Sequence, residues 1–187
     1  MTAIILAAGF SKRFGKEKLL MEIKNKPMIL HIVDVVLSLG FAENILVYRN
    51  EEIKEIAANR NIKCAYNAMA AKGQSTSIRC GIRNSDPTDA YIFFTGDQPF
   101  INSEAVKRLI SAFKEGKGSI IVPRYEGHNG NPVIFSSEWK QELEMISGDT
   151  GGRKIIRSHP GKVYYVDIAD TKIGMDIDTI EQYNLFK

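Results

Sequence analysis

Short apolar runs alternate with longer amphipathic segments along the whole chain. Apolar runs of about four to eight residues that end at turn-forming residues are typical of buried β-strands. The strands predicted in this way are residues 3–8, 45–48, 62–66, 90–94, 119–122, 132–135 and 163–167. Because segment 90–94 has the highest β propensity, we expect it near the middle of the sheet.

The segments between these strands place apolar residues at helical spacing. The clearest helix begins at Pro27, a residue favoured in the first turn, and ends at Gly40. Further helices are predicted at 51–59, at 77–84, after Asn102, around 139–146 and at 179–186. Ser75 or Thr76 would cap the second of these, and Asn102 the third. Residues 18–24 are predicted to form an extended arm. This alternation favours parallel strands joined by right-handed crossovers. The expected fold is therefore α/β, a three-layer α/β/α sandwich around a mostly parallel Rossmann-like sheet.

Composition and charge narrow the functional classes. The chain has 187 residues and 44% hydrophobic residues, which predicts one domain spanning 1–187 with a sizeable core. No apolar run approaches the ~18 residues of a membrane span, and no basic leader is present, so we expect a cytoplasmic protein without membrane contact. The net charge of +3 is not gathered into a basic stripe with aromatic residues. This argues against nucleic acid and fits a small anionic substrate.

The first candidate site is the loop after the first strand. It combines Gly9 and Ser11 with four cations, among them Arg13 and Lys18. Small residues let backbone N–H groups approach an anion, so this loop is suited to a polyphosphate. It is not a Walker loop, because the spacing from Gly9 to Gly15 is one residue too long and no Ser or Thr follows the lysine, and it lacks the dinucleotide-binding G-x-G-x-x-G. The alternative is a basic surface loop with solvated lysines.

The second candidate site is acidic. Asp97 follows the strand predicted to be central, where it could bind magnesium together with phosphate oxygens. Asp176 and Asp178 alternate with Ile177, so both would face one side, and one of them could complete the metal site. The alternatives are that Asp97 caps a turn and that Asp178 caps the last helix. The scattered histidines and the missing G-x-S-x-G motif disfavour covalent catalysis.

These motifs together resemble a known family. The pattern Leu6-Ala7-Ala8-Gly9-x-Ser11-x-Arg13-x-Gly15-x-x-Lys18 resembles the opening motif of MobA-like nucleotidyltransferases. The segment 96–99, Gly-Asp-Gln-Pro, resembles the metal motif of the molybdenum cofactor cytidylyltransferase (MocA-like) branch. Further motifs of that branch occur in the same order at 73–77, 130–132, 148–153 and 176–179. The resemblance spans nearly the whole chain and implies a sheet of the nucleotide-diphospho-sugar transferase type.

The resemblance implies a magnesium-dependent reaction, with manganese as a substitute, in which CTP or another NTP and a molybdopterin-type cofactor give a cytidine dinucleotide cofactor and pyrophosphate. Lys18 would neutralise the α-phosphate, and Asp97 would bind the metal together with Asp178 or Asp176. Alanine at position 8, where glycine would indicate guanylyl transfer, favours the cytidylyl branch. The other nucleotide contacts implied by the resemblance are Leu6, Ala7, Ala8, Gly9, Ser11 and Arg13, with Asn67, Gly73 and Ser75 bordering the base and ribose.

Two alternatives remain open on sequence grounds. The acceptor could instead be another phosphorylated molecule, such as a sugar, polyol or phospholactate. The chain could also be a non-catalytic accessory protein that hands finished cofactor to a molybdenum hydroxylase, the recipient that the resemblance implies. The presence of Arg13, Lys18 and Asp97 argues against the accessory role. Whether Asp149 and Arg153 contact a pterin or tie a loop to a helix is also open.

Overall fold

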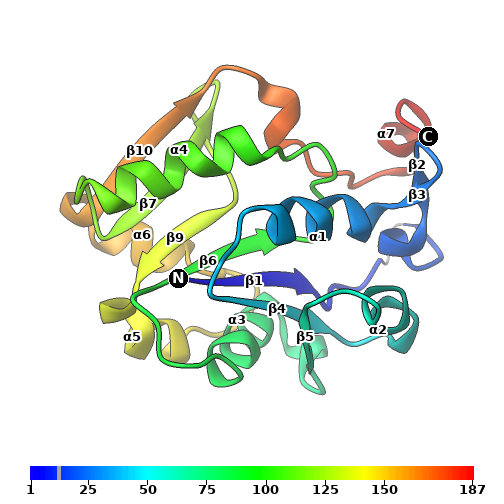
Figure 1. Cartoon of the computed structure of the whole chain (residues 1–187), viewed down its shortest axis with the longest axis horizontal. Coiled ribbons are helices and arrows are strands. Elements are labelled where there is room, and N and C mark those ends of the chain that lie inside the picture. The colour runs from blue at the N-terminus through cyan, green and yellow to red at the C-terminus, as the bar shows by residue number, and fades with distance from the viewer. Residues whose placement is uncertain (12–13) are drawn as a thin grey trace.

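The computed structural model describes residues 1–11 and 14–187, and its centre is an eight-stranded sheet. Seven strands follow the order β10-β7-β9-β6-β1-β4-β5, and β8 pairs with β7. Strand β6 lies at the middle of this order, as its sequence predicts (Figure 1). The strand bounds are β1 Thr2–Ala7, β4 Glu43–Tyr48, β5 Lys63–Tyr66, β6 Ala90–Thr95, β7 Ile120–Tyr125, β8 His128–Asn129, β9 Val133–Ser136 and β10 Val163–Ile168.

Most neighbouring strands are parallel. Strand β1 pairs in parallel with β4 and β6, β4 with β5, and β7 with β10. Strand β9 is antiparallel to both of its neighbours, β6 and β7. The prediction of a mostly parallel α/β sheet is therefore confirmed.

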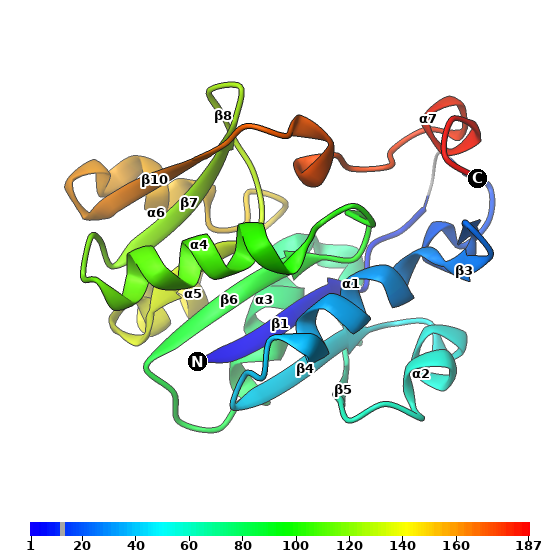
Figure 2. The same cartoon turned by 45° about the horizontal axis from the view of Figure 1, so that its top comes forward.

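Helices cover both faces of this sheet and give the three expected layers (Figures 1 and 2). Along β1, Ala3 and Ile5 face the core that α1, α2 and α4 cover, whereas Ile4 faces the core under α3, α5 and α6. This alternation is the period of two that buries both faces of a strand. The helix bounds are α1 Met28–Ser38, α2 Glu51–Ala57, α3 Gln74–Arg83, α4 Ser103–Lys114, α5 Lys140–Met145, α6 Arg153–Ser158 and α7 Ile180–Asn184.

Capping residues in the sequence predicted some helix starts correctly and others incorrectly. The Asn102 side chain accepts a hydrogen bond from the Ala105 N–H and caps α4, as predicted. Helix α3 begins at Gln74 rather than 77, so neither Ser75 nor Thr76 is its cap. The predicted arm at 18–24 is a 3₁₀ turn (η1, Lys18–Leu20) followed by β2 (Glu22–Ile23), which pairs with β3 (Lys26–Pro27).

The C-terminal segment crosses back toward the N-terminal part of the chain. After β10 it passes through the 3₁₀ turn η5 (Thr171–Gly174) to α7, which lies beside β2 and β3 (Figures 1 and 2). The Tyr183 hydroxyl donates a hydrogen bond of 2.8 Å to the Glu22 carbonyl. This path carries Asp176 and Asp178 past the end of the central strand.

None of the helices in the described part of the chain combines the length and apolarity required to span a bilayer.

Candidate functional site

Strands β1 and β6 bring the two candidate sites together at one edge of the sheet. They are parallel, and Leu6 lies opposite Thr95 in their register. The Gly96 N–H donates to the Leu6 carbonyl over 3.1 Å, so the loop after each strand begins beside the other. Ligands bind beyond the carboxyl ends of strands in sheets of this kind. The prediction that the loop at residues 9–18, the glycine loop, shares one edge with Asp97 is therefore confirmed. Arg13 of this loop lies outside the described residues.

A network of side chains braces the glycine loop. The Ser11 hydroxyl donates to Glu17 and accepts from the Lys18 N–H, both over 2.9 Å. Arg49 donates to the second carboxylate oxygen of Glu17 over 2.7 Å and to the Gly9 carbonyl over 3.1 Å. The register of β1 against β4 places Arg49 here, because Tyr48 lies opposite Ala7. Glu17 and Arg49 were not predicted as site residues, since nothing in the sequence indicates which strand lies beside β1.

Lys18 links the glycine loop to the acidic site. Its Nζ donates to Asp97 Oδ2 over 2.9 Å and to Asp178 Oδ1 over 3.2 Å. Burial by itself would lower the pKa of Lys18, but the carboxylates of Asp97 and Asp178 outweigh it and raise that pKa above its ordinary value. Lys18 therefore carries a full positive charge at neutral pH.

Asp176 and Asp178 project from an extended segment, as the alternation predicts. Ile177 between them is fully buried, and its N–H donates to the Asp97 carbonyl over 3.0 Å. The cap of α7 is Thr179, which forms a capping box with Gln182. The alternative in which Asp178 caps this helix is therefore wrong, and its carboxylate is available to Lys18.

The acidic residues suit a divalent cation. Asp97 Oδ1 and Asp176 Oδ1 are buried, and neither has a hydrogen-bond partner among the described residues. Buried carboxylate oxygens require a partner, and oxygen ligands are what magnesium and manganese take. No group of three or more His, Cys, Asp or Glu side chains within 1–11 and 14–187 would hold a metal alone. A cation here would therefore need oxygen ligands from the substrate, as magnesium at phosphate sites does.

The titration of Asp176 gives a prediction for the metal-free protein. Burial first, and then the charges of Asp97 and Asp178, raise the pKa of Asp176 from 3.8 to about 7. The folded chain thus holds this proton more tightly than the unfolded chain. The bound proton therefore stabilises the folded state at acidic pH. This stabilisation is lost as the pH rises to about 7, which lowers the free energy of unfolding by roughly 2–4 kcal/mol. Urea unfolding with EDTA between pH 5 and 8 measures this slope.

Asp176→Asn is the matched variant for that measurement. An amide carries no charge at any of these pH values, so the variant should lose most of the slope and be the more stable protein at pH 8. Exposed Asp167→Asn serves as the control and should keep the slope. A wild-type protein that grows more stable from pH 5 to 8 contradicts this reading of Asp176.

A pocket of about 330 Å³ opens beside Asp97 at the same edge. Four of the residues predicted to bind a nucleotide line it, together with the predicted metal ligand Asp97: Leu6, Ala8, Gly9 and Gly73. The other lining residues were not among the predicted nucleotide contacts: Phe10, Ala70, Ala71, Gln74, Ser77, Thr95 and Asp149. The pocket therefore joins the glycine loop, the acidic site and α3.

Three predicted contacts lie within the fold and not on the wall of this pocket. Ala7 and Ser75 are at most 1% exposed, and Asn67 is 4% exposed. The Asn67 amide donates to the hydroxyls of Thr76 and Ser77 over 2.9 and 3.0 Å. Asn67 and Ser75 therefore do not line this pocket, and the assignment of these two residues to the base and ribose stays a prediction. Gln74 and Ser77 face the pocket instead.

The backbone conformation and close contacts at position 73 require glycine. Its φ of +102° is rarely adopted by other residues, and a Cβ there would lie 2.6 Å from the Gly148 carbonyl carbon. Asp149 Oδ1 accepts from the Gln74 N–H over 3.1 Å. Asp149 therefore ties its loop to the start of α3, and among the described residues it has no ion pair with Arg153.

Comparison with known proteins decides the family. The model of the MobA-like NTP transferase domain matches residues 3–163. The chain belongs to the MobA-like NTP transferase family. This confirms the resemblance drawn from the motifs, and it makes the protein a nucleotidyltransferase, an enzyme that transfers a nucleotidyl group and releases pyrophosphate.

Relatives of known name show the breadth of this family. A probable molybdenum cofactor guanylyltransferase of Thermococcus sibiricus is 31% identical over 78% of this chain and 72% of its own length. Nicotine blue oxidoreductase of Paenarthrobacter nicotinovorans is 24% identical over 97% of this chain and 94% of its own.

A solved structure has the same fold. Rv0371c from Mycobacterium tuberculosis superimposes with a TM-score of 0.85 at 25% identity, covering 98% of this chain and 95% of that one. Its complex with manganese gives a TM-score of 0.83 at 24% identity, covering 99% and 96%.

Proposed function

We propose that this MobA-like enzyme transfers CMP from CTP to the phosphate of a molybdopterin-type cofactor, with magnesium as the divalent cation. The observation that carries the proposal is the position of Lys18, which is bonded to Asp97 on the wall of the nucleotide pocket and to Asp178 beside it. This arrangement supports the proposal because one largely buried cation and several carboxylates would surround a triphosphate bound there. On this proposal the finished cofactor goes to a molybdenum hydroxylase.

The residues have distinct tasks in this reaction. An oxygen of the acceptor phosphate forms a bond to the α-phosphorus of CTP, and the bond from that phosphorus to the bridging oxygen of the β-phosphate breaks, so that pyrophosphate leaves. Because the acceptor phosphate is already ionised, no protein base is needed. Lys18 neutralises the charge that develops on the α-phosphate. Backbone N–H groups of the loop at Gly9 and Ser11, together with Arg13, orient the triphosphate.

Asp97, with Asp176 or Asp178, would hold the divalent cation. When bound, such a cation neutralises phosphate oxygens and aligns the leaving group. The unpartnered oxygens of Asp97 and Asp176 support this assignment. The manganese complex of Rv0371c supports a divalent cation in a protein of the same fold.

The preference for CTP rests on Ala8, which lines the nucleotide pocket. A second candidate is GTP, since three relatives are named as probable molybdenum cofactor guanylyltransferases. One methyl group in a pocket changes discrimination by about 10- to 200-fold. We therefore expect kcat/KM for CTP to exceed that for GTP by at least about 10-fold, and Ala8→Gly to narrow the ratio.

Pyrophosphate release tests the proposal. Each of the four NTPs is combined with magnesium and either molybdopterin, glucosamine 1-phosphate or glycerol 3-phosphate. The expected result is release with molybdopterin as the only acceptor and the highest kcat/KM with CTP. A higher kcat/KM with GTP replaces the nucleotide assignment, and release with a sugar or polyol phosphate replaces the acceptor.

A further inference from the structure

Tyr125, at the end of β7, contacts two segments that are far apart in the sequence. Its side chain is largely buried, and its hydroxyl donates a hydrogen bond of 2.9 Å to the Asn131 carbonyl. A Cβ on Gly130 would lie 2.5 Å from ring carbon Cε2, and a Cβ on Gly174 would also overlap the ring. Neither glycine has a positive φ, so the space taken by the ring accounts for glycine at both positions.

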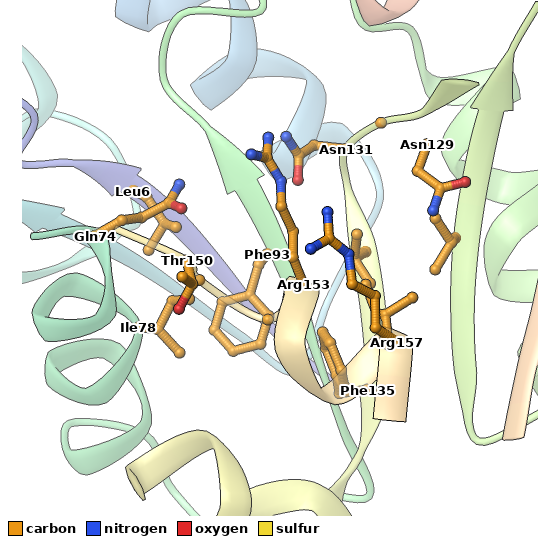
Figure 3. Close-up of a pocket in the computed structure, with 16 residues that line it drawn as sticks. Leu6, Gln74, Ile78, Phe93, Asn129, Asn131, Phe135, Thr150, Arg153 and Arg157 are labelled. Carbon is orange, nitrogen blue, oxygen red and sulfur yellow. The ribbon is translucent and has the colours of Figure 1, made fainter. Parts of the chain in front are cut away.

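The first of these segments is the turn between β8 and β9. Gly130 and Asn131 in this turn line a second pocket, of about 300 Å³, between β9, α3 and α6 (Figure 3). Leu6 and Gln74 line both this pocket and the nucleotide pocket. The hydroxyl of Tyr125 therefore supports the wall of a pocket that adjoins the nucleotide pocket.

The second segment leads to Asp176. The tyrosine ring packs against Gly174, and the buried Gln98 amide donates to the Gly174 carbonyl over 3.0 Å. On the other side of Asp176, the Ile177 N–H donates to the Asp97 carbonyl over 3.0 Å. Asp176 is therefore held between contacts at 174 and at 177. These contacts fix where its unpartnered Oδ1 lies relative to Asp97.

Asp178 depends on different contacts. Its backbone N–H donates to Gln182 Oε1 over 2.7 Å, and its carboxylate accepts from Lys18 over 3.2 Å. Gln182 is itself fixed by the capping box of α7. Loss of the Tyr125 ring is therefore expected to release Asp176 and to leave Asp178 in place.

We propose that Tyr125 is a positioning residue for the divalent cation, because its ring holds the segment at 174 so that the Asp176 carboxylate can share the cation with Asp97. The ring has this role and the hydroxyl does not, since the hydroxyl bonds to the turn before β9. The inference rests on the cation of the proposed function. It goes beyond that function because it selects Asp176 rather than Asp178 as the carboxylate that joins Asp97.

The test is a titration of the nucleotide-free protein with manganese, in which electron paramagnetic resonance measures the free ion. Loss of a residue that orients a metal ligand typically weakens metal binding by about 10- to 100-fold. We expect this effect in Tyr125→Leu and in Gly174→Ala, whose new Cβ would push against the ring. Tyr125→Phe keeps the ring and should bind manganese as tightly as wild type. Tyr164→Leu is the matched control, because it removes an exposed tyrosine from β10.

Combined variants separate positioning from a general loss of stability. In an Asp176→Asn background, Tyr125→Leu should weaken manganese binding no further, because the carboxylate that the ring positions is gone. In an Asp178→Asn background the full effect should remain. Equal effects of Tyr125→Leu in both backgrounds and in wild type would overturn the proposal, as would wild-type affinity in Tyr125→Leu and Gly174→Ala. Urea unfolding shows that each variant is folded under the conditions of the titration.

Asp97→Asn distinguishes a failure of this inference from a failure of the proposed function. If Asp97→Asn weakens manganese binding and the variants at 125 and 174 do not, the metal site stands and the role of Tyr125 is wrong. If Asp97→Asn binds manganese as wild type does, the metal site of the proposed function is wrong, and the inference is overturned with it.

Discussion

Replacing Asp97 by Asn is expected to reduce pyrophosphate release by about 10³-fold while leaving the fold intact. The substitution keeps the size of the side chain but removes a charge on the nucleotide pocket wall and a ligand oxygen that is buried without a partner. It also relieves repulsion from Asp176, whose raised pKa is caused in part by the charge of Asp97. This relief offsets part of the loss of the ion pair with Lys18, which keeps Asp178 as a partner, so the variant should remain folded. Steady-state pyrophosphate release at saturating magnesium and NTP measures the effect.

The control for this variant is Asp167→Asn, because Asp167 lies on β10 with a 79% exposed side chain. It should retain wild-type turnover. NTP binding with magnesium gives a second readout, since a metal ligand affects how the triphosphate is held. Wild-type turnover in Asp97→Asn would rule out the assignment of this carboxylate to the metal.

Much of the fold could be predicted from the sequence, because patterns of apolar residues within short segments determine the strands and helices. Apolar runs predicted the sheet strands, and the alternation of strands with helices predicted their parallel pairing. From that pairing it follows that loops after parallel strands share an edge, which brings Gly9 and Asp97 together. The antiparallel β9 fits the same local pattern, and its direction depends on the path of the chain through β8 and the turn before it.

The residues that line the nucleotide pocket were less predictable, because they depend on the residue at which α3 begins. Ser and Thr are common helix caps, so Ser75 and Thr76 favour a helix that begins at residue 77. In the structure Gly73 packs against the loop at 148–149, and α3 begins at Gln74, three residues before the predicted start. That contact joins segments 75 residues apart in sequence. Residues 74–76 are thus the first helical turn and not a loop; Gln74 and Ser77, about one turn apart, line the pocket, and Ser75 between them is buried.

The pairing of Lys18 was also beyond local reasoning. Its partners lie 79 and 160 residues along the chain. Sequence motifs indicated that Lys18, Asp97 and Asp178 are functional residues, but not that the lysine occupies the space between the carboxylates. This arrangement has a consequence for the metal, because a cation on Asp97 Oδ1 would share one carboxylate with the ammonium group of Lys18 on Oδ2, and the two positive charges repel each other.

Lys18→Gln is therefore expected to have two opposite effects. Turnover should fall by about 10²- to 10³-fold, since the α-phosphate loses the cation that stabilises its developing charge. Affinity of the nucleotide-free protein for manganese should rise, because Asp97, Asp176 and Asp178 are left without a neutralising lysine. Isothermal titration with manganese and steady-state pyrophosphate release measure the two effects on one preparation.

Lys16→Gln is the matched control, because it removes a lysine two residues away in the same loop and should change neither quantity. The opposed directions distinguish a catalytic role for Lys18 from a purely structural one. If Lys18 only held the fold together, its loss would lower turnover, thermal stability and metal affinity at the same time. Manganese affinity that falls together with turnover in Lys18→Gln would contradict repulsion between the lysine and the metal at Asp97.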